Sequence, residues 1–364
     1  MNSRERVLKT VRHQLPDRFP LDGWFLCSVM KNLKDYYKVK DTDSVLEKLG
    51  IDFRCTCMEP DEKIKADYSY LKQMGLSIMI DDYYVKEVRK DEYEDEWGIR
   101  IKVTGDKDLD WKYSYHPLND SGKLSLDNLK IPDLSSGKRF EKLKKDIEKY
   151  SSKYIVAAGV STLFRKSWLL CGYSRFLEAL YIDKAFVEKL LDILMEFYME
   201  LIRLYINYGV DIIELGGDLG TEESLMISPD LWRSIFKPRL KRIIGGNKKE
   251  GIYFYLHSDG NISSIIPDLI EIGIDILNPI QPECMDPKKI KEKYGEQITL
   301  HGTTSLQKTF TQGTKDDLKN EILNRINDCG YNGGLVLAPS NAFTDDVPIE
   351  SIVFFYDFIK GYYI

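Results

Sequence analysis

The feature of this sequence that most constrains its fold is a repeated alternation of short apolar runs and helical patterns. Eight runs have the length and composition of β-strands, at residues 19–25, 51–57, 154–159, 211–215, 252–257, 275–280, 298–301 and 335–338. Each of the last six precedes a helical pattern, for example at 229–244, 262–272, 314–329 and 348–362. Strands that alternate with helices form a parallel sheet with crossover connections. Eight such units predict an α/β fold, namely a (β/α)8 TIM barrel.

The segment from about residue 77 to 134 departs from this alternation. It is acidic, is interrupted by Gly and Asp, and contains three runs typical of short antiparallel strands, at 83–88, 97–103 and 111–115. A separate small domain is one interpretation, but the segment has few aliphatic residues with which to form its own core. We therefore predict a single barrel domain over residues 1–364, with a small antiparallel insertion or lid after the second strand.

The composition excludes several classes of protein. The chain has 364 residues, of which 43% are hydrophobic and 30% are charged, and no segment approaches the roughly 18 uninterrupted apolar residues that span a bilayer. Charged and apolar residues alternate at the N-terminus, unlike in a signal peptide, so we expect a cytoplasmic protein without membrane association. The net charge of −6 and the mixing of lysines with acids predict no nucleic-acid binding.

The cysteines indicate reduced thiols. Six are scattered along the chain without the paired spacing of a metal finger: Cys27, Cys55, Cys57, Cys171, Cys284 and Cys329. Cys55 and Cys57 form a C-x-C pair that invites a metal-binding interpretation. At the end of a predicted buried strand, packing is the favoured role for such a pair.

The run at 252–257 ends abruptly in His257, Ser258, Asp259 and Gly260. Ligands of α/β folds bind beyond the carboxyl ends of the strands. Because side chains two positions apart on a strand point to the same side, His257 and Asp259 can converge on one metal ion or one substrate group. In the alternative interpretation, His257 only ends a strand and Asp259 only caps the following helix.

Other predicted strands also end in polar residues. They are Ser161, Thr162 and Arg165 after the third strand, Glu214 and Asp218 at the fourth, Asn278 and Gln281 at the sixth, His301, Thr303 and Thr304 at the seventh, and Ser340 and Asn341 at the eighth. The glycines between Glu214 and Asp218 match neither a dinucleotide fingerprint nor a P-loop. Together with His257, His301 places two of the four histidines in the chain at predicted strand ends.

These groups are consistent with three kinds of site. His257, His301 and the carboxylates of Glu214, Asp218 and Asp259 could bind a divalent ion, most plausibly zinc. They could instead be acid–base groups for a carboxylate substrate, with Arg165 or Arg175 as the counter-charge. The third interpretation is a hydrogen-bond network without metal.

Several segments resemble the uroporphyrinogen decarboxylase superfamily over nearly the whole chain. They are 4–8 (RERVL), 16–20 (PDRFP), 217–221 (GDLGT), 227–230 (ISPD), 237–239 (KPR), 257–260 (HSDG), 266–273 (IPDLIEIG), 275–279 (DILNP) and 333–340 (GGLVLAPS). The resemblance independently implies a (β/α)8 barrel. It also implies one of two chemistries, which are cofactor-free decarboxylation of tetrapyrrole acetate groups and zinc-dependent methyl transfer involving a corrinoid protein.

The resemblance departs from both chemistries at particular residues. The decarboxylases carry an N-terminal signature whose arginines bind substrate carboxylates, whereas 21–30 (LDGWFLCSVM) contains no arginine. The methyltransferases bind zinc through a His-x-Cys pair and a later Cys. This chain keeps His257, but Asp259 replaces the first Cys, and Ser340 or Asn341 lies near the second.

The combined expectation is an enzyme that transfers a methyl group between a small-molecule substrate and a corrinoid (methylcobamide) carried by a corrinoid protein. His257 and Asp259 would hold zinc as metal ligands, with Glu214, Asp218 or His301 completing the set. The expected catalytic residues are Asp218, Glu214, His301 and Arg165. The alternative is metal-free decarboxylation of a carboxylate substrate, with Asp218 or Asp259 as the acid–base group and Arg165 as the anchor.

Overall fold

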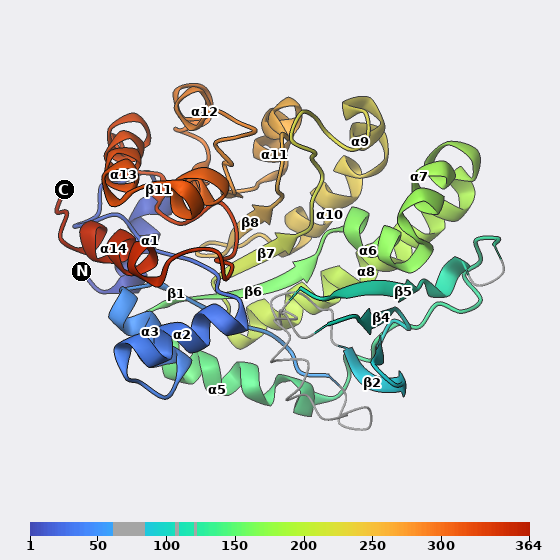
Figure 1. Cartoon of the computed structure of the whole chain (residues 1–364). Helices are drawn as coiled ribbons and strands as arrows, with labels where there is room; N and C mark the ends of the chain where they lie inside the picture. Colours follow the sequence, from blue (N-terminus) through green and yellow to red (C-terminus); the bar gives the residue numbers. More distant parts are fainter. Residues whose placement is uncertain (61–83, 106–108, 120–121) are drawn as a thin grey trace.

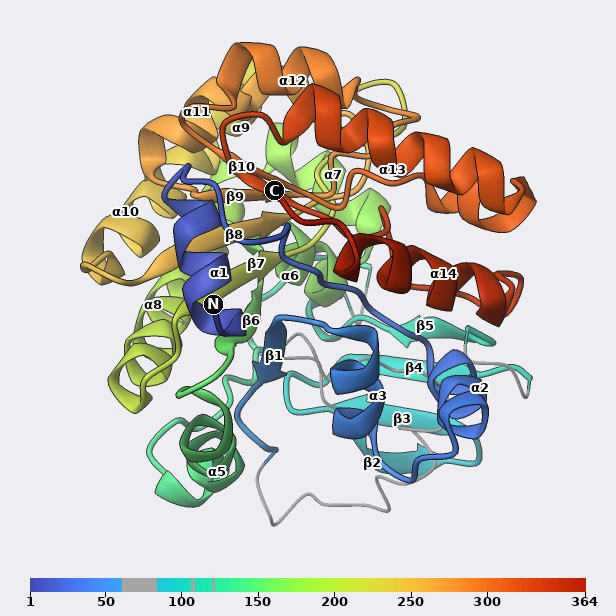
Figure 2. The ribbon, with the colours of Figure 1, turned by 90° about the vertical axis from the view of Figure 1, so that its left-hand side faces the viewer.

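The structure is a computed structural model that describes residues 1–60, 84–105, 109–119 and 122–364. Its main sheet has seven parallel strands, which neighbour one another in the order in which they occur in the chain. They are β1 (Phe53–Thr56), β6 (Ile155–Ser161), β7 (Ile212–Gly216), β8 (Tyr253–His257), β9 (Ile276–Asn278), β10 (Thr299–His301) and β11 (Leu335–Val336). The sheet is curled, and helices cover its outer face (Figures 1 and 2). The predicted parallel α/β architecture is confirmed.

The helices connect and flank these strands. They are α1 (Ser3–Val11), α2 (Cys27–Tyr37), α3 (Thr42–Leu49), α5 (Glu141–Tyr150), α6 (Leu163–Cys171), α7 (Tyr173–Ile182), α8 (Lys184–Tyr208), α9 (Pro229–Ile235), α10 (Lys237–Asn247), α11 (Ile266–Ile272), α12 (Pro287–Tyr294), α13 (Lys315–Cys329) and α14 (Ile349–Lys360). Short 3-10 turns lie at Pro117–Asn119, Gly137–Phe140 and Ser263–Ile265, and a π-helical turn spans Leu306–Phe310. Among the described residues, no helix is long and apolar enough to cross a membrane.

The expected first strand, at 19–25, is not a strand. It makes only isolated bridges, from Leu21 to Leu337 and from Phe25 to Phe343. Pro20 has no N–H to donate, and the Asp22 carboxylate accepts from the N–H of Gly23, so regular pairing stops here. The backbone around Leu21 nevertheless bonds to Leu337 on one side and to Asp52, next to β1, on the other. Eight strands were expected; the described sheet has seven, and this segment lies between its two edges.

Apolar side chains cover both faces of the sheet. Inside the curl lies a cluster that includes Phe53, Ile155, Ala157, Ile212 and Tyr255. A larger cluster fills the space between the outer face and the helices. Burial on both faces explains why the strands form continuous apolar runs in the sequence.

A second, antiparallel sheet consists of β2 (Tyr84–Arg89), β3 (Glu92–Asp95), β4 (Arg100–Val103) and β5 (Trp111–Tyr115). It lies to one side of the parallel sheet (Figure 1). The three predicted short strands correspond to β2, β4 and β5, whereas β3 was not predicted. The predicted start of the insertion, at residue 77, lies outside the described residues.

Candidate active site at the carboxyl ends of the strands

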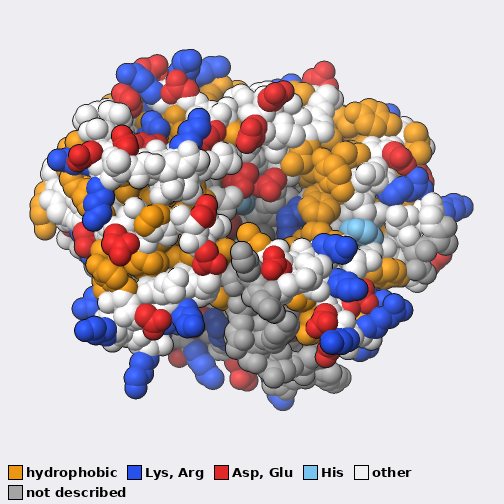
Figure 3. Space-filling model, in the orientation of Figure 1, with side chains coloured by type: hydrophobic (Ala, Val, Ile, Leu, Met, Phe, Trp, Pro, Cys, Tyr) orange, Lys and Arg blue, Asp and Glu red, His pale blue; other side chains and the backbone are white. Residues whose placement is uncertain are grey.

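The inner face of the sheet becomes polar where its strands end. Ile212, Tyr255 and Ile276, on β7, β8 and β9, belong to the apolar cluster inside the curl. Glu214, His257 and Asn278 lie two positions further along the same strands and therefore face the same side. The strand register thus converts a buried apolar face into a group of polar side chains at one end of the sheet. Near this region the surface has a hollow in which acidic side chains meet (Figure 3).

The loops after β7 and β8 pack directly against each other. A Cβ atom at Gly260, where φ is +82°, would lie 2.5 Å from the carbonyl oxygen of Thr221, and one at Gly220 would lie 3.0 Å from the carbonyl oxygen of Asp259. The N–H of Asn261 donates to Thr221 across the same contact, at 2.7 Å. Only glycine permits such a close approach of two backbones. The contact brings the segments that carry Asp218 and Asp259 together.

Asp218, His257 and Asp259 form a group that could hold a metal ion. Each offers one ligand atom, and these atoms lie within 4.8 Å of one another. His257 Nε2 lies 3.9 Å from Asp218 Oδ1, which accepts from the N–H of Asp259 at 2.9 Å. Asp259 Oδ2 accepts from Asn341 Nδ2 at 2.5 Å, whereas its Oδ1 is buried and has no hydrogen-bond partner among the described residues. A buried carboxylate oxygen without a donor is the kind of atom that a cation satisfies.

The charges of this group act on one another. Burial lowers the pKa of His257, but the carboxylates of Asp259, Asp218 and Glu214 outweigh burial, so the pKa is raised above its ordinary value. Burial raises the pKa of Asp259 to about 6, although His257 opposes the shift. Burial also raises the pKa of Glu214 to about 7, and His257 again opposes the shift. The site therefore concentrates carboxyl groups around a single imidazole.

A chain of hydrogen bonds runs from His257 into the core. His257 Nδ1 lies 2.6 Å from Asn278 Oδ1, and Asn278 Nδ2 lies 2.7 Å from His301 Nδ1. The chain ends where His301 Nε2 meets Asp22 Oδ2 at 3.0 Å. His301 and Asn278 are fully buried, and Asp22 is 6% exposed. This chain links the group of Asp218, His257 and Asp259, called the metal-type group below, to the segment that lies between β11 and β1.

Beneath the group lies a small cavity of about 10 Å³, which is roughly the room of one water molecule. Its lining consists of Asp22, Trp24, Phe53, Cys55, Ala157, Ile212, Glu214 and Tyr255. The hydroxyl of Tyr255 is buried without a hydrogen-bond partner among the described residues. The ring of Trp24 lies 5.7 Å from those of both His257 and His301. Aromatic rings thus line the cavity and contact both histidines.

Arg165 also lies at this end of the sheet. Its Nη1 donates to Ser161 Oγ at 3.3 Å, and its Nη2 donates to the hydroxyl of Tyr113 on β5 at 3.4 Å. A Cβ atom at Gly217, next to Asp218, would lie 2.6 Å from the Cβ of Arg165. Arg165 therefore connects the antiparallel sheet with the loop after β7. The alternative counter-charge, Arg175, instead pairs with Glu178 on the surface of α7.

The structure brings most of the predicted site residues together. His257, Asp259 and Asp218 form the metal-type group, and Glu214 faces the cavity beneath it. His301 does not join the group, because both of its ring nitrogens are engaged by Asn278 and Asp22. Asn341, at the end of the last predicted strand, contacts Asp259 directly.

Three residues of the site were not predicted: Asp22, Trp24 and Tyr255. Trp24 and Tyr255 are aromatic residues, and in a sequence such residues favour a place in the core. Asp22 lies within the expected first strand, and an acidic side chain inside an apolar run was the available signal for a functional role. Of the C-x-C pair, Cys57 is buried and Cys55 lines the cavity.

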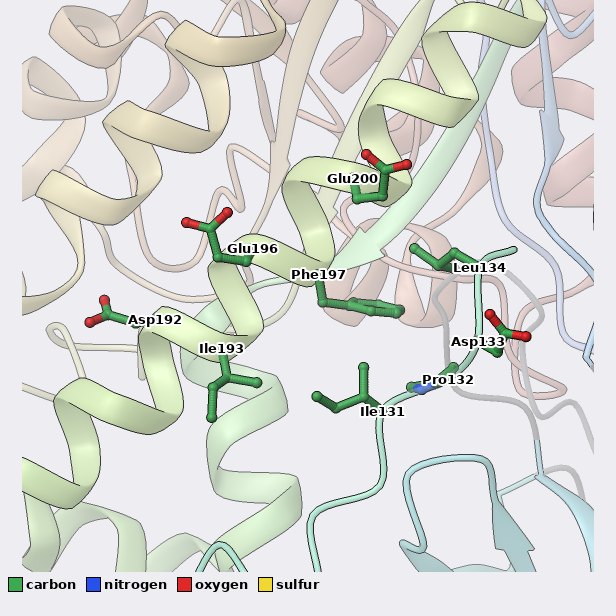
Figure 4. A pocket seen from close by; sticks show the side chains of 9 residues that line it. All are labelled: Ile131, Pro132, Asp133, Leu134, Asp192, Ile193, Glu196, Phe197 and Glu200. Atoms are coloured by element: carbon green, nitrogen blue, oxygen red, sulfur yellow. The ribbon is translucent and has the colours of Figure 1, made fainter. Parts of the chain in front are cut away.

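A larger hollow, of about 560 Å³, lies between α8 and residues 131–134 (Figure 4). Its apolar side chains are Ile131, Pro132, Leu134, Ile193 and Phe197. Three of its acids, on α8, pair with arginines: Asp192 with Arg239, Glu196 with Arg242 and Glu200 with Arg203. None of the residues described above lines this hollow, so the strand ends are the better candidate for an active site.

Comparisons with known proteins agree with this architecture. A family model described as "Uroporphyrinogen decarboxylase (URO-D)" matches residues 131–362. A solved methyltransferase from Methanosarcina mazei is 18% identical, with 99% of this chain and 98% of that chain covered and a TM-score of 0.71. A B12-independent methionine synthase from Shewanella sp. W3-18-1, in complex with selenomethionine, is 11% identical, with 95% and 96% covered and a TM-score of 0.53. Curated protein sequences give no significant match.

Proposed function

This chain belongs to the uroporphyrinogen decarboxylase family, and from that premise we propose that it is a methyltransferase that uses a divalent metal ion, zinc, and a methylated corrinoid. Asp218, His257 and Asp259 would hold the ion. The observation that carries the proposal is Asp259 Oδ1, a buried carboxylate oxygen without a hydrogen-bond donor beside an imidazole and a second carboxylate.

The residues of the group fit such an ion. Zinc binds imidazole nitrogen and carboxylate oxygen at about 2.0–2.2 Å, so two ligand atoms in a tetrahedral site lie about 3.4 Å apart. The 3.9 Å between His257 Nε2 and Asp218 Oδ1 is close to that separation. One nitrogen and two oxygens would match the three protein ligands that catalytic zinc sites commonly have.

Two further observations favour methyl transfer over decarboxylation of a tetrapyrrole. The two structural neighbours described above are a methyltransferase and a methionine synthase, and both are covered almost completely by the alignment. The segment 21–30, which carries Asp22 and Trp24 into the site, contains no arginine for the many carboxylates of a porphyrinogen.

Three residues around the ligands of the ion have defined parts in this proposal: Asn278, Glu214 and Trp24. A bound zinc ion would supply Lewis acidity at the reacting group of the methyl acceptor. Asn278 orients His257 through the hydrogen bond between Asn278 Oδ1 and His257 Nδ1. Glu214, whose pKa is raised by burial to about 7, can hold or release a proton near neutral pH at the floor of the site. Trp24 excludes water from the side of His257 and His301.

Elemental analysis of protein purified without chelator tests the metal site. We expect about one zinc ion per chain in the wild type and none in His257→Ala and Asp259→Ala. The matched control is Asp127→Ala, which removes an exposed carboxylate elsewhere and should keep the metal. The reaction is then tested by mixing the protein with methylcobalamin and a thiol, amine or alcohol acceptor. Absorbance measures the loss of the methyl group from methylcobalamin.

Absence of zinc even after incubation with excess ion would overturn the metal site and favour metal-free decarboxylation of a carboxylate substrate. Zinc binding without any consumption of methylcobalamin would retain the ion and reject the corrinoid as the donor.

A further inference from the structure

The hydrogen-bond chain from Asp22 to His257 has a direction, and we infer that Asn278 is a positioning residue that fixes the tautomer of His257. The inference deepens the proposed function, because the tautomer decides whether His257 can bind a metal ion through Nε2. Asn278 is fully buried at the end of β9, between the two histidine rings. Its side-chain amide has one accepting and one donating end, so it transmits direction from one ring to the other.

The direction is set at Asp22. Its carboxylate can only accept, so His301 must donate from Nε2 across the 3.0 Å contact. Asn278 Nδ2 faces His301 Nδ1 at 2.7 Å and donates to it, which requires that nitrogen to be unprotonated. Asn278 Oδ1 consequently faces His257, and it accepts the hydrogen on Nδ1 at 2.6 Å.

The consequence appears at the other nitrogen of His257. When the neutral ring carries its hydrogen on Nδ1, the lone pair of Nε2 is available on the side of Asp218, which lies 3.9 Å away. Metal-binding histidines are commonly held in this way, through a hydrogen bond from the nitrogen that does not bind the metal. The rings of Trp24, Phe53 and Tyr255 pack around His301, so the inner part of the chain, at His301 and Asn278, is shielded from water.

Asp22→Asn should reverse the whole chain. Asp22 Oδ1 accepts from the N–H of Gly23 at 2.9 Å, and the new amide must keep its oxygen there. Its NH2 group would then face His301 Nε2 and force the hydrogen of His301 onto Nδ1. The amide of Asn278 would flip to accept it and would donate to His257 Nδ1. His257 would become protonated at Nε2 and could no longer bind a metal through that atom.

Two substitutions at position 278 separate orientation from packing. Asn278→Leu keeps the volume but has no acceptor, so both tautomers of His257 should appear. Asn278→Asp accepts at both oxygens, so it should keep the hydrogen on His257 Nδ1 and rescue the wild-type tautomer. A purely structural role for Asn278 would give no such contrast between the two variants.

The test is ¹⁵N nuclear magnetic resonance of protein labelled at histidine, at alkaline pH where the ring is neutral. The chain has only four histidines, and His257→Gln assigns the signal. We expect the Nδ1–H form in the wild type and in Asn278→Asp, the Nε2–H form in Asp22→Asn and a mixture in Asn278→Leu. Glu214→Gln is the control, because it removes a neighbouring carboxyl group outside the hydrogen-bond chain and should leave the tautomer unchanged.

An Nε2–H tautomer in the wild type, or an unchanged spectrum in Asp22→Asn, would overturn the inference. Zinc titration separates this failure from that of the proposed function. If zinc binds, its affinity should fall about 10–100-fold in Asp22→Asn. If the wild type binds no zinc but the tautomers follow the expected pattern, the positioning role stands and the metal site fails. Circular dichroism and thermal unfolding show whether each variant is folded.

Discussion

Glu214 is a carboxyl group held inside the curled sheet, and its protonation is linked to the stability of the fold. Burial raises its pKa to about 7 from an ordinary value of 4.5. Between these two values the folded chain holds a proton that the unfolded chain releases. Its contribution to stability is therefore fully present below about pH 4.5 and is lost as the pH rises to about 7.

Glu214→Gln should remove this dependence. The decrease in the free energy of unfolding between pH 4.5 and 7 should become smaller by an amount on the order of 3 kcal/mol. Urea unfolding at a series of pH values measures it. Glu250→Gln, at an exposed position, is the control and should retain the wild-type slope. Parallel curves for the wild type and Glu214→Gln would contradict the assignment of a buried, protonated glutamate.

The sequence predicts a site role for residues that lie directly at strand ends. It misses residues whose role depends on a partner far away along the chain. His257 and Asp259 follow one strand within two positions, so their convergence follows from local geometry. Asp22 meets His301 across 279 positions. No local pattern encodes such a contact, which depends on how the sheet curls.

The loops after β7 and β8 pack closely, and substitutions at two glycines test how much this contact contributes to stability. Gly260 and Gly251 both have φ of +82°, but a Cβ at Gly251 would meet no atom within 4 Å. Gly251→Ala should cost only the backbone strain of a positive φ, about 1–2 kcal/mol. Gly260→Ala should cost more, because its Cβ would lie 2.5 Å from the carbonyl oxygen of Thr221.

Thermal unfolding and zinc titration check this pair of variants. We expect Gly260→Ala to lose zinc affinity as well as stability, since the displaced loop carries Asp259. Gly251→Ala should retain zinc affinity. Equal effects of the two variants would mean that the loop contact does not position Asp259.

The segment between the two edges of the sheet depends on one buried carboxylate. Asp52 accepts from Arg6 at 2.7 Å, from Arg18 at 2.9 Å and from the N–H of Leu21 at 2.9 Å. Asp52→Asn would leave two arginines without this counter-charge in a buried setting and should destabilise the chain by about 3–5 kcal/mol. Urea unfolding measures the loss of stability, and Asp17→Asn is the control. Because Asp17 is one-third exposed, its loss should cost less.

The elements themselves were predictable where their patterns are strong. Thr314 begins α13 through a capping box, close to the predicted start. The predicted helix at 229–244 is divided into α9 and α10 at Phe236, and Pro238 favours a new helix start at that point. β3 (Glu92–Asp95) was missed because its acidic sequence is typical of a loop. Glu94 in this strand pairs with Arg100, and Glu96, directly after it, pairs with Arg139.

At the scale of the whole molecule, the site joins parts of the chain that are distant in sequence. Asp22 comes from the segment before α2, His257 from β8 and Asn341 from the region after β11. The antiparallel sheet reaches the same end of the parallel sheet through Tyr113 and Arg165. An ion bound by Asp218, His257 and Asp259 would therefore couple the order of several segments to its own binding.

Metal binding should consequently stabilise the folded chain as a whole. An ion at 100 times its dissociation constant adds about 2.7 kcal/mol to the free energy of unfolding, which corresponds to a rise in Tm of about 3–6 °C. Chelator should lower the Tm of the wild type by this amount, and added zinc should restore it. His257→Ala should show neither change, because the ion would have lost its only nitrogen ligand in the group. A similar response to zinc in His257→Ala would place the stabilising ion elsewhere on the molecule and reject this site as its origin.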